Sequence, residues 1–283
     1  MSKDSAFRNK SWSPIPDRDE ITLARAACDI LETPQAADKA RRTHDVAAAW
    51  RSGAIVDVGR ASPSLRPLRA SRPELKPPRD MPRRRINKGA AGRIALLHAV
   101  AHIELNAIDL AWDIIARFTE SNLPPAFYDD WVAVADEEAK HFQLLSGRLG
   151  MLGAAYGDLP AHDGLWDAAE QTSGDILARL AIAPLLLEAR GLDVTPGMID
   201  KLESVGDTDS VAVLKVIYQD EVGHVAAGVR WFEWVAGQRG LEPKTTYRDL
   251  VRRHFTSRIK PPFNTAARDA AGFSADWYES LVE

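Results

Sequence analysis

Cysteine is almost absent from this sequence, since Cys28 is the only one in 283 residues. A single thiol excludes an intramolecular disulfide, and it also excludes a metal cluster held by several thiolates of this chain. The composition fits a reducing compartment. We therefore expect the chain to be stabilised by its hydrophobic core, for which a hydrophobic content of 45% is sufficient.

Long hydrophobic runs are missing as well. The longest nearly apolar run covers residues 180–187 and is interrupted by Pro184. No run reaches the length of about 18 residues that a membrane-spanning helix needs. The first residues are polar and contain no apolar segment of the kind found in secretory signals. The sequence predicts a cytoplasmic protein without a membrane partner.

An excess of one charge is also lacking, because the formal net charge is only −4. Global charge therefore gives no reason to expect a nucleic acid or a membrane surface as partner. The informative charges are local.

Two short runs of the same shape carry the strongest signal. Asp136–His141 reads D-E-E-A-K-H and Gln219–His224 reads Q-D-E-V-G-H, so that Glu-x-x-His occurs in both. Residues three apart on a helix share a face, with Cβ atoms about 5–6 Å apart. A carboxylate and an imidazole placed in this way can hold one cation between them.

Each run also has a glutamate upstream on an apolar helical pattern. Glu104 precedes Glu138 by 34 residues, and Glu188 precedes Glu221 by 33. A lone Glu-x-x-His is usually a solvated pair on a helix surface, whereas two copies with matching upstream acids favour a metal site. Four glutamates and two histidines on four helices are the ligand set of dinuclear carboxylate proteins. The predicted ligands are Glu104, Glu138, His141, Glu188, Glu221 and His224.

The donor set indicates which metal to expect. Four carboxylates and two neutral imidazoles balance the charge of two divalent ions. Hard oxygen ligands combined with imidazole suit iron or manganese, whereas closed zinc sites more often use cysteine and histidine. We expect two Fe ions, with Mn or a mixed Fe/Mn pair as the alternative.

Three neighbouring residues are candidates for supporting roles. Glu137 and Asp220 each precede a predicted ligand and are expected to orient the histidine of the opposite run through hydrogen bonds. The alternative for both is a solvated acid. Tyr218 lies one helical turn before Glu221, where it can hydrogen-bond a ligand, take part in redox chemistry or serve as an ordinary core tyrosine.

The hydrophobic periodicity predicts an all-α protein built on a four-helix bundle. The expected regions are a helical N-terminal cap at 1–53, an extended arm at 54–88, the bundle at 89–238 and a helical tail at 239–283. The expected bundle helices are 89–119, 125–149, 173–190 and 208–238. Smaller helices are expected at 19–32, 34–51, 165–171, 195–205, 245–257, 265–271 and 275–282.

Two local features bear on the third bundle helix. Pro184 lies four residues before Glu188, so it should kink the helix or open its hydrogen-bond ladder there. Gly191 is expected to end the same helix.

The arm at 54–88 contains six prolines and ten Arg or Lys residues. Prolines at this density forbid a long helix or a central strand. One interpretation is an extended segment that wraps the domain, with its cations solvated or paired. The other is a contact with a polyanion such as RNA, although the arm has almost no aromatic residues to stack on bases.

The six predicted ligands resemble those of the ferritin-like di-iron carboxylate superfamily. Their order and spacing are similar to those of acyl-carrier-protein desaturases and bacterial monooxygenase hydroxylases. Residues 60–283 resemble more closely an uncharacterised bacterial ferritin-like family, a domain of unknown function. The runs that carry this likeness are M-P-R-R-R-I-N-K-G, H-A-V-A-H-I-E-L-N-A-I-D-L-A-W-D, L-E-A-R-G-L-D, Y-Q-D-E-V-G-H-V and P-P-F-N-T-A-A-R. A resemblance to tRNA hydroxylases of the same fold is more remote.

The resemblance implies that the six positions bind two irons that activate O₂. The first functional hypothesis is an oxidase or hydroxylase that acts on a small or tethered organic substrate, with a homodimer as one candidate assembly. The second is a tRNA-modifying hydroxylase that uses Arg83, Arg84 and Arg85 as part of its footprint. The third is a non-catalytic protein that handles iron or is stabilised by metal. Neither the substrate nor the electron donor follows from the sequence.

Overall fold

The computed structural model describes residues 21–77, 80–81 and 89–282. Within these ranges the regular structure is helical. Pairing of extended backbone is limited there to two isolated bridges, Leu75 with Ala161 and Ile259 with Val282. The all-α class expected from the periodicity is confirmed.

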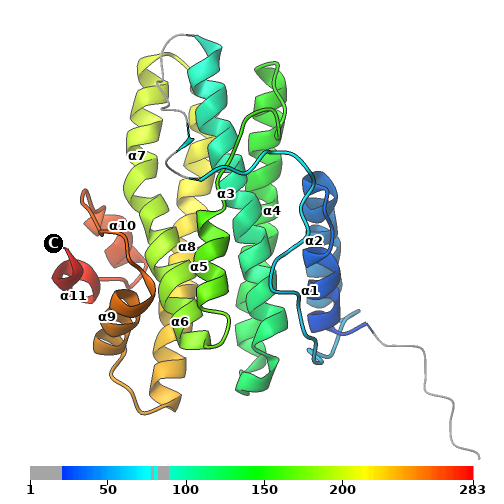
Figure 1. Cartoon of the computed structure of the whole chain (residues 1–283), viewed down its shortest axis with the longest axis vertical. Helices are drawn as coiled ribbons and strands as arrows, with labels where there is room; N and C mark the ends of the chain where they lie inside the picture. The colour runs from blue at the N-terminus through cyan, green and yellow to red at the C-terminus, as the bar shows by residue number, and fades with distance from the viewer. Residues whose placement is uncertain (1–20, 78–79, 82–88, 283) are drawn as a thin grey trace, which may run out of the picture.

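Four long helical stretches run alongside one another (Figure 1). Three of them are single helices, α3 (Ala90–Arg117), α4 (Pro125–Met151) and α8 (Thr208–Gln238). The fourth is composite and consists of α6 (Ile176–Leu180), the π-helical segment η3 (Ala181–Glu188) and α7 (Ala189–Ser204). Their facing side chains form one hydrophobic core.

Local sequence explains where these helices begin. Pro125 occupies the first turn of α4, where a missing N–H costs nothing. Asp207 caps α8 by accepting a hydrogen bond from the Ser210 N–H through its side chain. The bounds of α8 are those predicted from the sequence.

The composite stretch of α6, η3 and α7 differs from its prediction in one respect. Gly191 does not end the helix, because the chain stays helical from Ile176 to Ser204 without a break. Gly191 has no positive φ, and the adjacent Ala189 and Leu192 are fully buried. Packing of these neighbours holds the helix together in spite of the local preference of glycine. The separate helix predicted at 195–205 is the continuation of this one.

The expected distortion at Pro184 takes the form of the π-helical segment. Proline has no N–H, and its ring collides with the carbonyl four residues earlier in a regular α-helix. Widening the turn relieves that collision. Gly228 of α8 packs against this point, and a Cβ placed there would lie 2.9 Å from the Pro184 Cβ.

Smaller helices cover two sides of the four stretches (Figure 1). The first pair, α1 (Leu23–Leu31) and α2 (Ala36–Arg51), packs on α3 and α4. On the other side lie α9 (Pro243–His254), α10 (Thr265–Ala270) and α11 (Ala275–Tyr278), followed by a 3₁₀ turn at Glu279–Leu281. The crossover carries α5 (Gly164–Gln171), and a 3₁₀ turn at Thr119–Ser121 follows α3.

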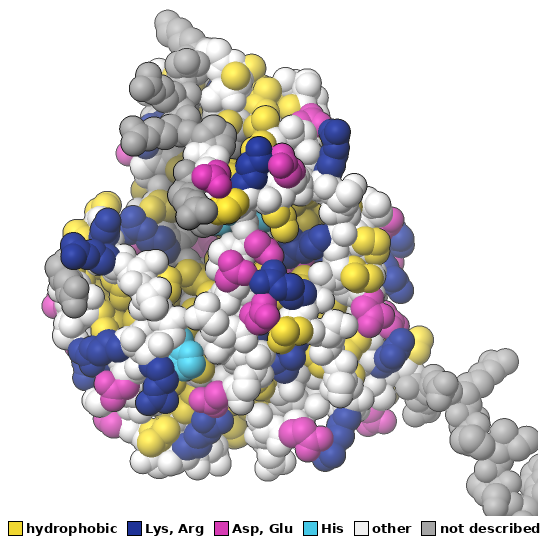
Figure 2. All heavy atoms as spheres, viewed as in Figure 1, with side chains coloured by type: hydrophobic (Ala, Val, Ile, Leu, Met, Phe, Trp, Pro, Cys, Tyr) yellow, Lys and Arg dark blue, Asp and Glu magenta, His cyan; other side chains and the backbone are white. Residues whose placement is uncertain are grey.

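In its described part, the arm is extended, and Arg60, Arg66 and Arg69 are paired with acids. Arg60 forms an ion pair with Glu120 at 2.9 Å, and Arg66 contacts Asp163 at 2.5 Å. Positive and negative side chains are also interspersed on the face shown in Figure 2. These contacts agree with the interpretation of the arm as a wrapping segment. Arg83, Arg84 and Arg85 lie outside the described residues.

Helix α3 is the most apolar of the long helices. Its best window has a mean hydropathy of 1.4, enough by length and composition to cross a membrane, yet 78% of that window is buried inside the protein. It is the core helix of this fold. Other helices surround it, so its hydrophobic residues are used in packing.

Two aspartates of α3 are fully buried in ion pairs that the sequence did not reveal. Asp109 contacts Lys39 of α2 and Arg69 of the arm, the latter at 2.6 Å. Asp113 contacts Arg117 at 2.6 Å and Arg179 of α6. These pairs attach α2, the arm and α6 to the same helix.

We predict that Asp109→Asn destabilises the protein strongly. The change leaves Lys39 buried without its counter-charge, which should lower the free energy of unfolding by about 3–5 kcal/mol. Urea denaturation followed by circular dichroism measures this. Asp167→Asn, which removes an exposed partner of Arg66, is the matched control and should cost less than about 1 kcal/mol. Equal losses in both variants would contradict a structural role for the buried pair.

Candidate metal centre

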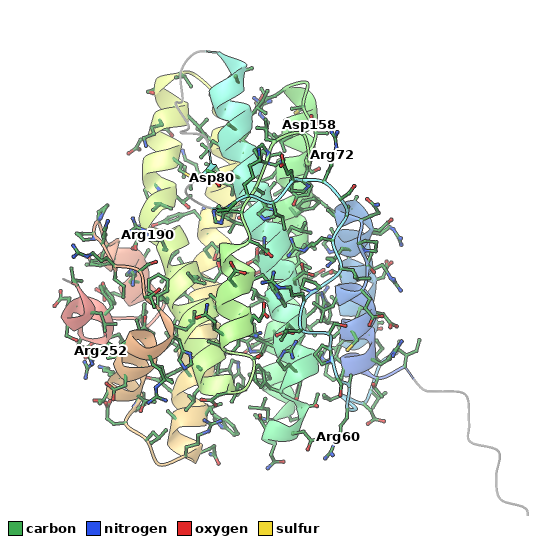
Figure 3. All side chains as sticks on the ribbon, in the orientation of Figure 1. Arg60, Arg72, Asp80, Asp158, Arg190 and Arg252 are labelled. Carbon is green, nitrogen blue, oxygen red and sulfur yellow. The ribbon has the colours of Figure 1, made fainter. Side chains whose placement is uncertain are left out.

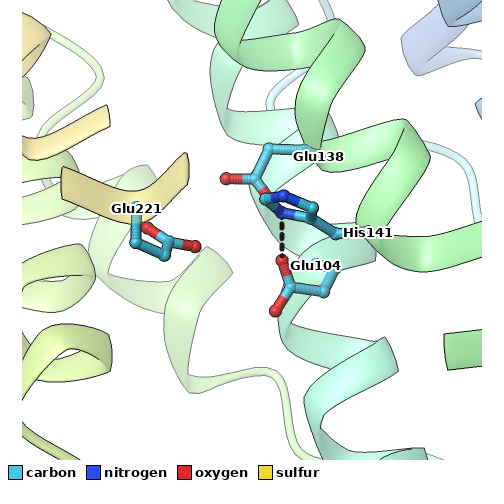
Figure 4. A group of neighbouring side chains, drawn as sticks. All are labelled: Glu104, Glu138, His141 and Glu221. Atoms are coloured by element: carbon cyan, nitrogen blue, oxygen red, sulfur yellow. Dashed lines mark hydrogen bonds and ion pairs between the residues drawn. The ribbon is translucent and has the colours of Figure 1, made fainter. Parts of the chain in front are cut away.

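Four of the predicted ligands converge in the core. Glu104 comes from α3, Glu138 and His141 come from α4, and Glu221 comes from α8 (Figure 4). One ligand atom from each lies within 4.8 Å of the others, and all four residues are buried. The group therefore has the composition and spacing to hold a metal ion.

Glu138 lies between the two imidazoles. Its Oε1 is 2.9 Å from Nδ1 of His224, and its Oε2 is 3.5 Å from Nδ1 of His141. The flanking acids repeat this pattern, with 3.3 Å between His141 Nδ1 and Glu104 and 3.5 Å between His224 Nδ1 and Glu221. Each inner nitrogen thus faces two carboxylates, and Glu138 is common to both halves.

The outer nitrogens of the histidines are held by acids from the opposite run. Nε2 of His141 lies 2.9 Å from Oδ2 of Asp220, and Nε2 of His224 lies 2.8 Å from Oε2 of Glu137. A carboxylate only accepts, so both Nε2 atoms carry the proton. In a neutral ring Nδ1 is then left with its lone pair directed at the cluster, as a metal ligand requires.

The other two predicted ligands, Glu188 and His224, lie next to this group and line a small cavity beside it. They line it together with Glu138, and apolar residues such as Leu110, Trp131 and Pro184 complete the wall. The cavity measures about 20 Å³. The structure therefore brings all six predicted ligands into one connected group.

Crowding of acids perturbs the ionisation of the group. Burial, reinforced by the charges of Glu221 and Glu138, raises the pKa of Glu188 well above its usual value. Burial by itself disfavours the charged ring of His141, but Glu104 and Glu138 outweigh that effect and raise its pKa to about 11. Without a metal cation, the cluster needs bound protons to balance its charge.

Several buried atoms of the cluster have no hydrogen-bond partner among the described residues. They are Glu138 Oε2, Glu221 Oε2 and His224 Nδ1. The distance of 2.9 Å between His224 Nδ1 and Glu138 Oε1 lacks the alignment of a hydrogen bond. Unpaired buried polar atoms are costly, and a cation bound between them would satisfy all three. The residues present fit a metal with oxygen and imidazole ligands.

Tyr218 packs against the hydrophobic core, which agrees with the role of a core tyrosine, and its hydroxyl contacts the tail. Its hydroxyl accepts a hydrogen bond from the side chain of Asn264 at 2.6 Å. Asn264 precedes α10 and caps it through Ala267, so Tyr218 ties the tail to α8. Its observed contact is with the tail and not with the ligand cluster, because the residue lies far enough round α8 to meet α10.

Fold and site together define an all-helical protein with a buried glutamate and histidine cluster that could hold a metal ion. The chain belongs to the family described as "Protein of unknown function (DUF455)", whose model matches residues 32–279. A protein of Haemophilus influenzae strain Rd, described as "Uncharacterized protein", is 41% identical over 214 residues, which are 73% of this chain and 74% of the relative. No solved structure matches the chain.

We predict that Glu138→Ala and His224→Ala lower metal content and melting temperature together. Metal that binds only the folded state at 100 times its Kd adds about 2.7 kcal/mol of stability. Anaerobic addition of Fe(II) or Mn(II) should therefore raise the melting temperature of the parent protein and leave both variants unchanged. Glu203→Ala removes an exposed surface pair with Lys215 and serves as control. Full metal content in both site variants would show that the ligands are misassigned.

A further prediction concerns Asp220. Asp220→Ala removes the acceptor that fixes the His141 ring, so metal affinity should fall by about 10–100-fold while the fold is retained. Competition with a chelating dye measures the affinity. Glu233→Ala, an exposed acid on the same helix, should change nothing. An unaltered affinity in Asp220→Ala would mean that this hydrogen bond does not position the ring.

Proposed function

We propose that the chain is a ferritin-like four-helix protein with a dinuclear, non-haem metal centre that oxidises an organic substrate with O₂. The observation that carries the proposal is the two-fold arrangement around Glu138. Two Glu-x-x-His runs and two upstream glutamates, from four helical stretches, supply four carboxylates and two imidazoles to one buried group.

The proposed division of ligands follows the distances. Glu104 and His141 would hold one ion, whereas Glu188 and His224 would hold the other. Glu138 faces both imidazoles and would be shared, and Glu221 lies beside His224. The donor set and the proposed reaction with O₂ favour iron as the metal, with manganese as the alternative.

Two bound irons would supply the activation of O₂. The chain's own residues provide the surroundings for this chemistry. Asp220 and Glu137 keep the histidine protons on the outer nitrogens, so that the inner ones remain available. Leu110, Trp131 and Pro184 keep the side of Glu138 and Glu188 apolar and small, which excludes bulk water.

The size of the cavity restricts what can reach the ligands. A cavity needs about 10–15 Å³ to hold one water molecule. A cavity of about 20 Å³ beside Glu138 thus admits a diatomic gas or a water molecule, but not a substrate of many atoms. A larger substrate requires movement of the wall, in which Trp131 is the bulkiest residue. The small cavity is compatible with O₂ entry and sets a steric condition on the substrate.

Two alternative functions differ from this proposal, one because it involves no catalytic turnover and the other because its substrate is RNA. A metal-stabilised protein without turnover would use the same ligands, and the O₂ experiment below separates it from the oxidase. A tRNA-modifying hydroxylase would need an RNA footprint on Arg83, Arg84 and Arg85. In the described arm, Arg60 and Arg66 are already paired with acids, which favours a substrate other than RNA.

We predict that the reduced, iron-loaded protein consumes O₂ in proportion to its bound iron. An oxygen electrode measures uptake after anaerobic loading and removal of free metal. Glu138→Ala, given the same iron, should lose the uptake because the shared ligand is missing. The metal-free protein is the second control. Tight iron binding with no O₂ uptake beyond that of free Fe(II) would contradict the oxidase and favour the metal-stabilised protein.

A further inference from the structure

A second cavity lies on the outer side of α3 and α4, away from the small one at the ligands. It measures about 400 Å³, which is within the range of sites for small organic ligands. Its walls come from the start of α2, arm residues 69–73 and Leu75, α3, α4 and the crossover near Tyr156. We call it the arm cavity, because arm residues form part of its wall.

The charged side chains that line the arm cavity are of one sign. Arg69 and Arg72 line it, and no Asp or Glu occurs among the described residues of its wall. Beneath Arg69, the buried carboxylate of Asp109 is shared by two cations, Lys39 and Arg69. One negative charge between two positive ones leaves that cluster with a net positive charge, and Arg72 adds to it.

Donors for an anion are present and incompletely used. Nε of Arg69 is buried and has no hydrogen-bond partner among the described residues. The same side chain is fixed in place by its Nη2, which donates to Asn106 at 3.0 Å. Helix α2 starts at this cavity, and its N-cap Gln35 makes no side-chain capping hydrogen bond. The first N–H groups of a helix attract anions.

The rest of the wall suits a hydrocarbon body. Leu75, Leu105 and Phe142 are apolar, and the Tyr156 ring packs edge-on against Phe142. The hydroxyl of Tyr156 is already engaged. Nε2 of His102 faces the carbonyl of His162 at 3.1 Å and must donate to it, so Nδ1 accepts from Tyr156 at 2.8 Å. The arginines are therefore the groups that would bind the polar part of a ligand.

We propose that the arm cavity binds a small organic anion, with a carboxylate or phosphate on an apolar body. Arg72 would contact the anionic group, the buried Arg69 would add positive charge beside it, and Leu105 and Phe142 would cover the body. Leu105 and Phe142 directly follow the cluster residues Glu104 and His141 in the chain, so this ligand site and the metal centre use adjacent faces of the same two helices. The proposal does not depend on the metal.

Isothermal titration calorimetry on the full chain tests the assignment with four probes. They are 3-phenylpropionate, phenyl phosphate, the neutral 3-phenylpropanol and inorganic phosphate. We expect binding of at least one organic anion, at least about tenfold weaker binding of the alcohol because it lacks the charge-assisted contact, and weaker binding of inorganic phosphate because it lacks the body. Preference for phenylpropionate or phenyl phosphate identifies the anionic group. Equal affinity for the alcohol, or no binding of either organic anion, overturns the proposal.

Variants locate the site. Arg72→Gln should weaken binding of the preferred anion by about tenfold or more. Arg60→Gln is the matched control, since Arg60 is an arm arginine at the opposite end of the molecule (Figure 3). Ser146→Phe, which fills the cavity from α4, should abolish binding. Melting curves and metal content should stay at parent values in all three, so a failure here is distinct from a failure of the metal centre. Unchanged affinity in both Arg72→Gln and Ser146→Phe excludes the arm cavity.

Discussion

The burial of carboxylates beside one another is the constraint on which the rest of this structure depends. Glu104, Glu138 and Glu221 lie in the core within reach of two imidazoles, where unneutralised acids are costly. Protons can balance the cluster, as the raised pKa of Glu188 shows, but they leave atoms such as His224 Nδ1 unpaired. A cation removes both problems at once. Any metal ion that binds this cluster would therefore also stabilise the fold.

Helix α3 carries buried carboxylates on more than one face. Successive residues of a helix are about 100° apart, so Asp109 lies about 140° and Asp113 about 180° round from Glu104. Glu104 faces the glutamate and histidine cluster, whereas the two aspartates face cations from α2, the arm and α6. Helix α2, the arm and α6 therefore supply counter-charges to the helix that carries Glu104. They are structural parts of the core and not additions to it.

Sequence reasoning succeeded where a local pattern has a unique spatial meaning. The 3-residue spacing in Glu138 and His141 fixes their common face, and the polar cap at Asp207 fixes the start of α8. It failed where distant partners decide. Lys39 and Asp109 are 70 residues apart, and neither has a local signal for the other. Tyr218 shares a helix with Glu221, but Asn264 of the tail determines where its hydroxyl binds.

The π-helical segment shows how far a local rule extends. Pro184 requires an opened hydrogen-bond ladder, and the sequence places that opening one turn before Glu188. The sequence alone does not say whether the helix bends, ends or widens. Gly228 of α8 packs so closely against Pro184 that even one Cβ at that position would meet the proline ring. The widened turn is therefore held directly against α8, and it ends at Glu188. The local rule predicts that the helix is distorted here, whereas the packing of the distorted turn depends on a glycine 44 residues further along the chain.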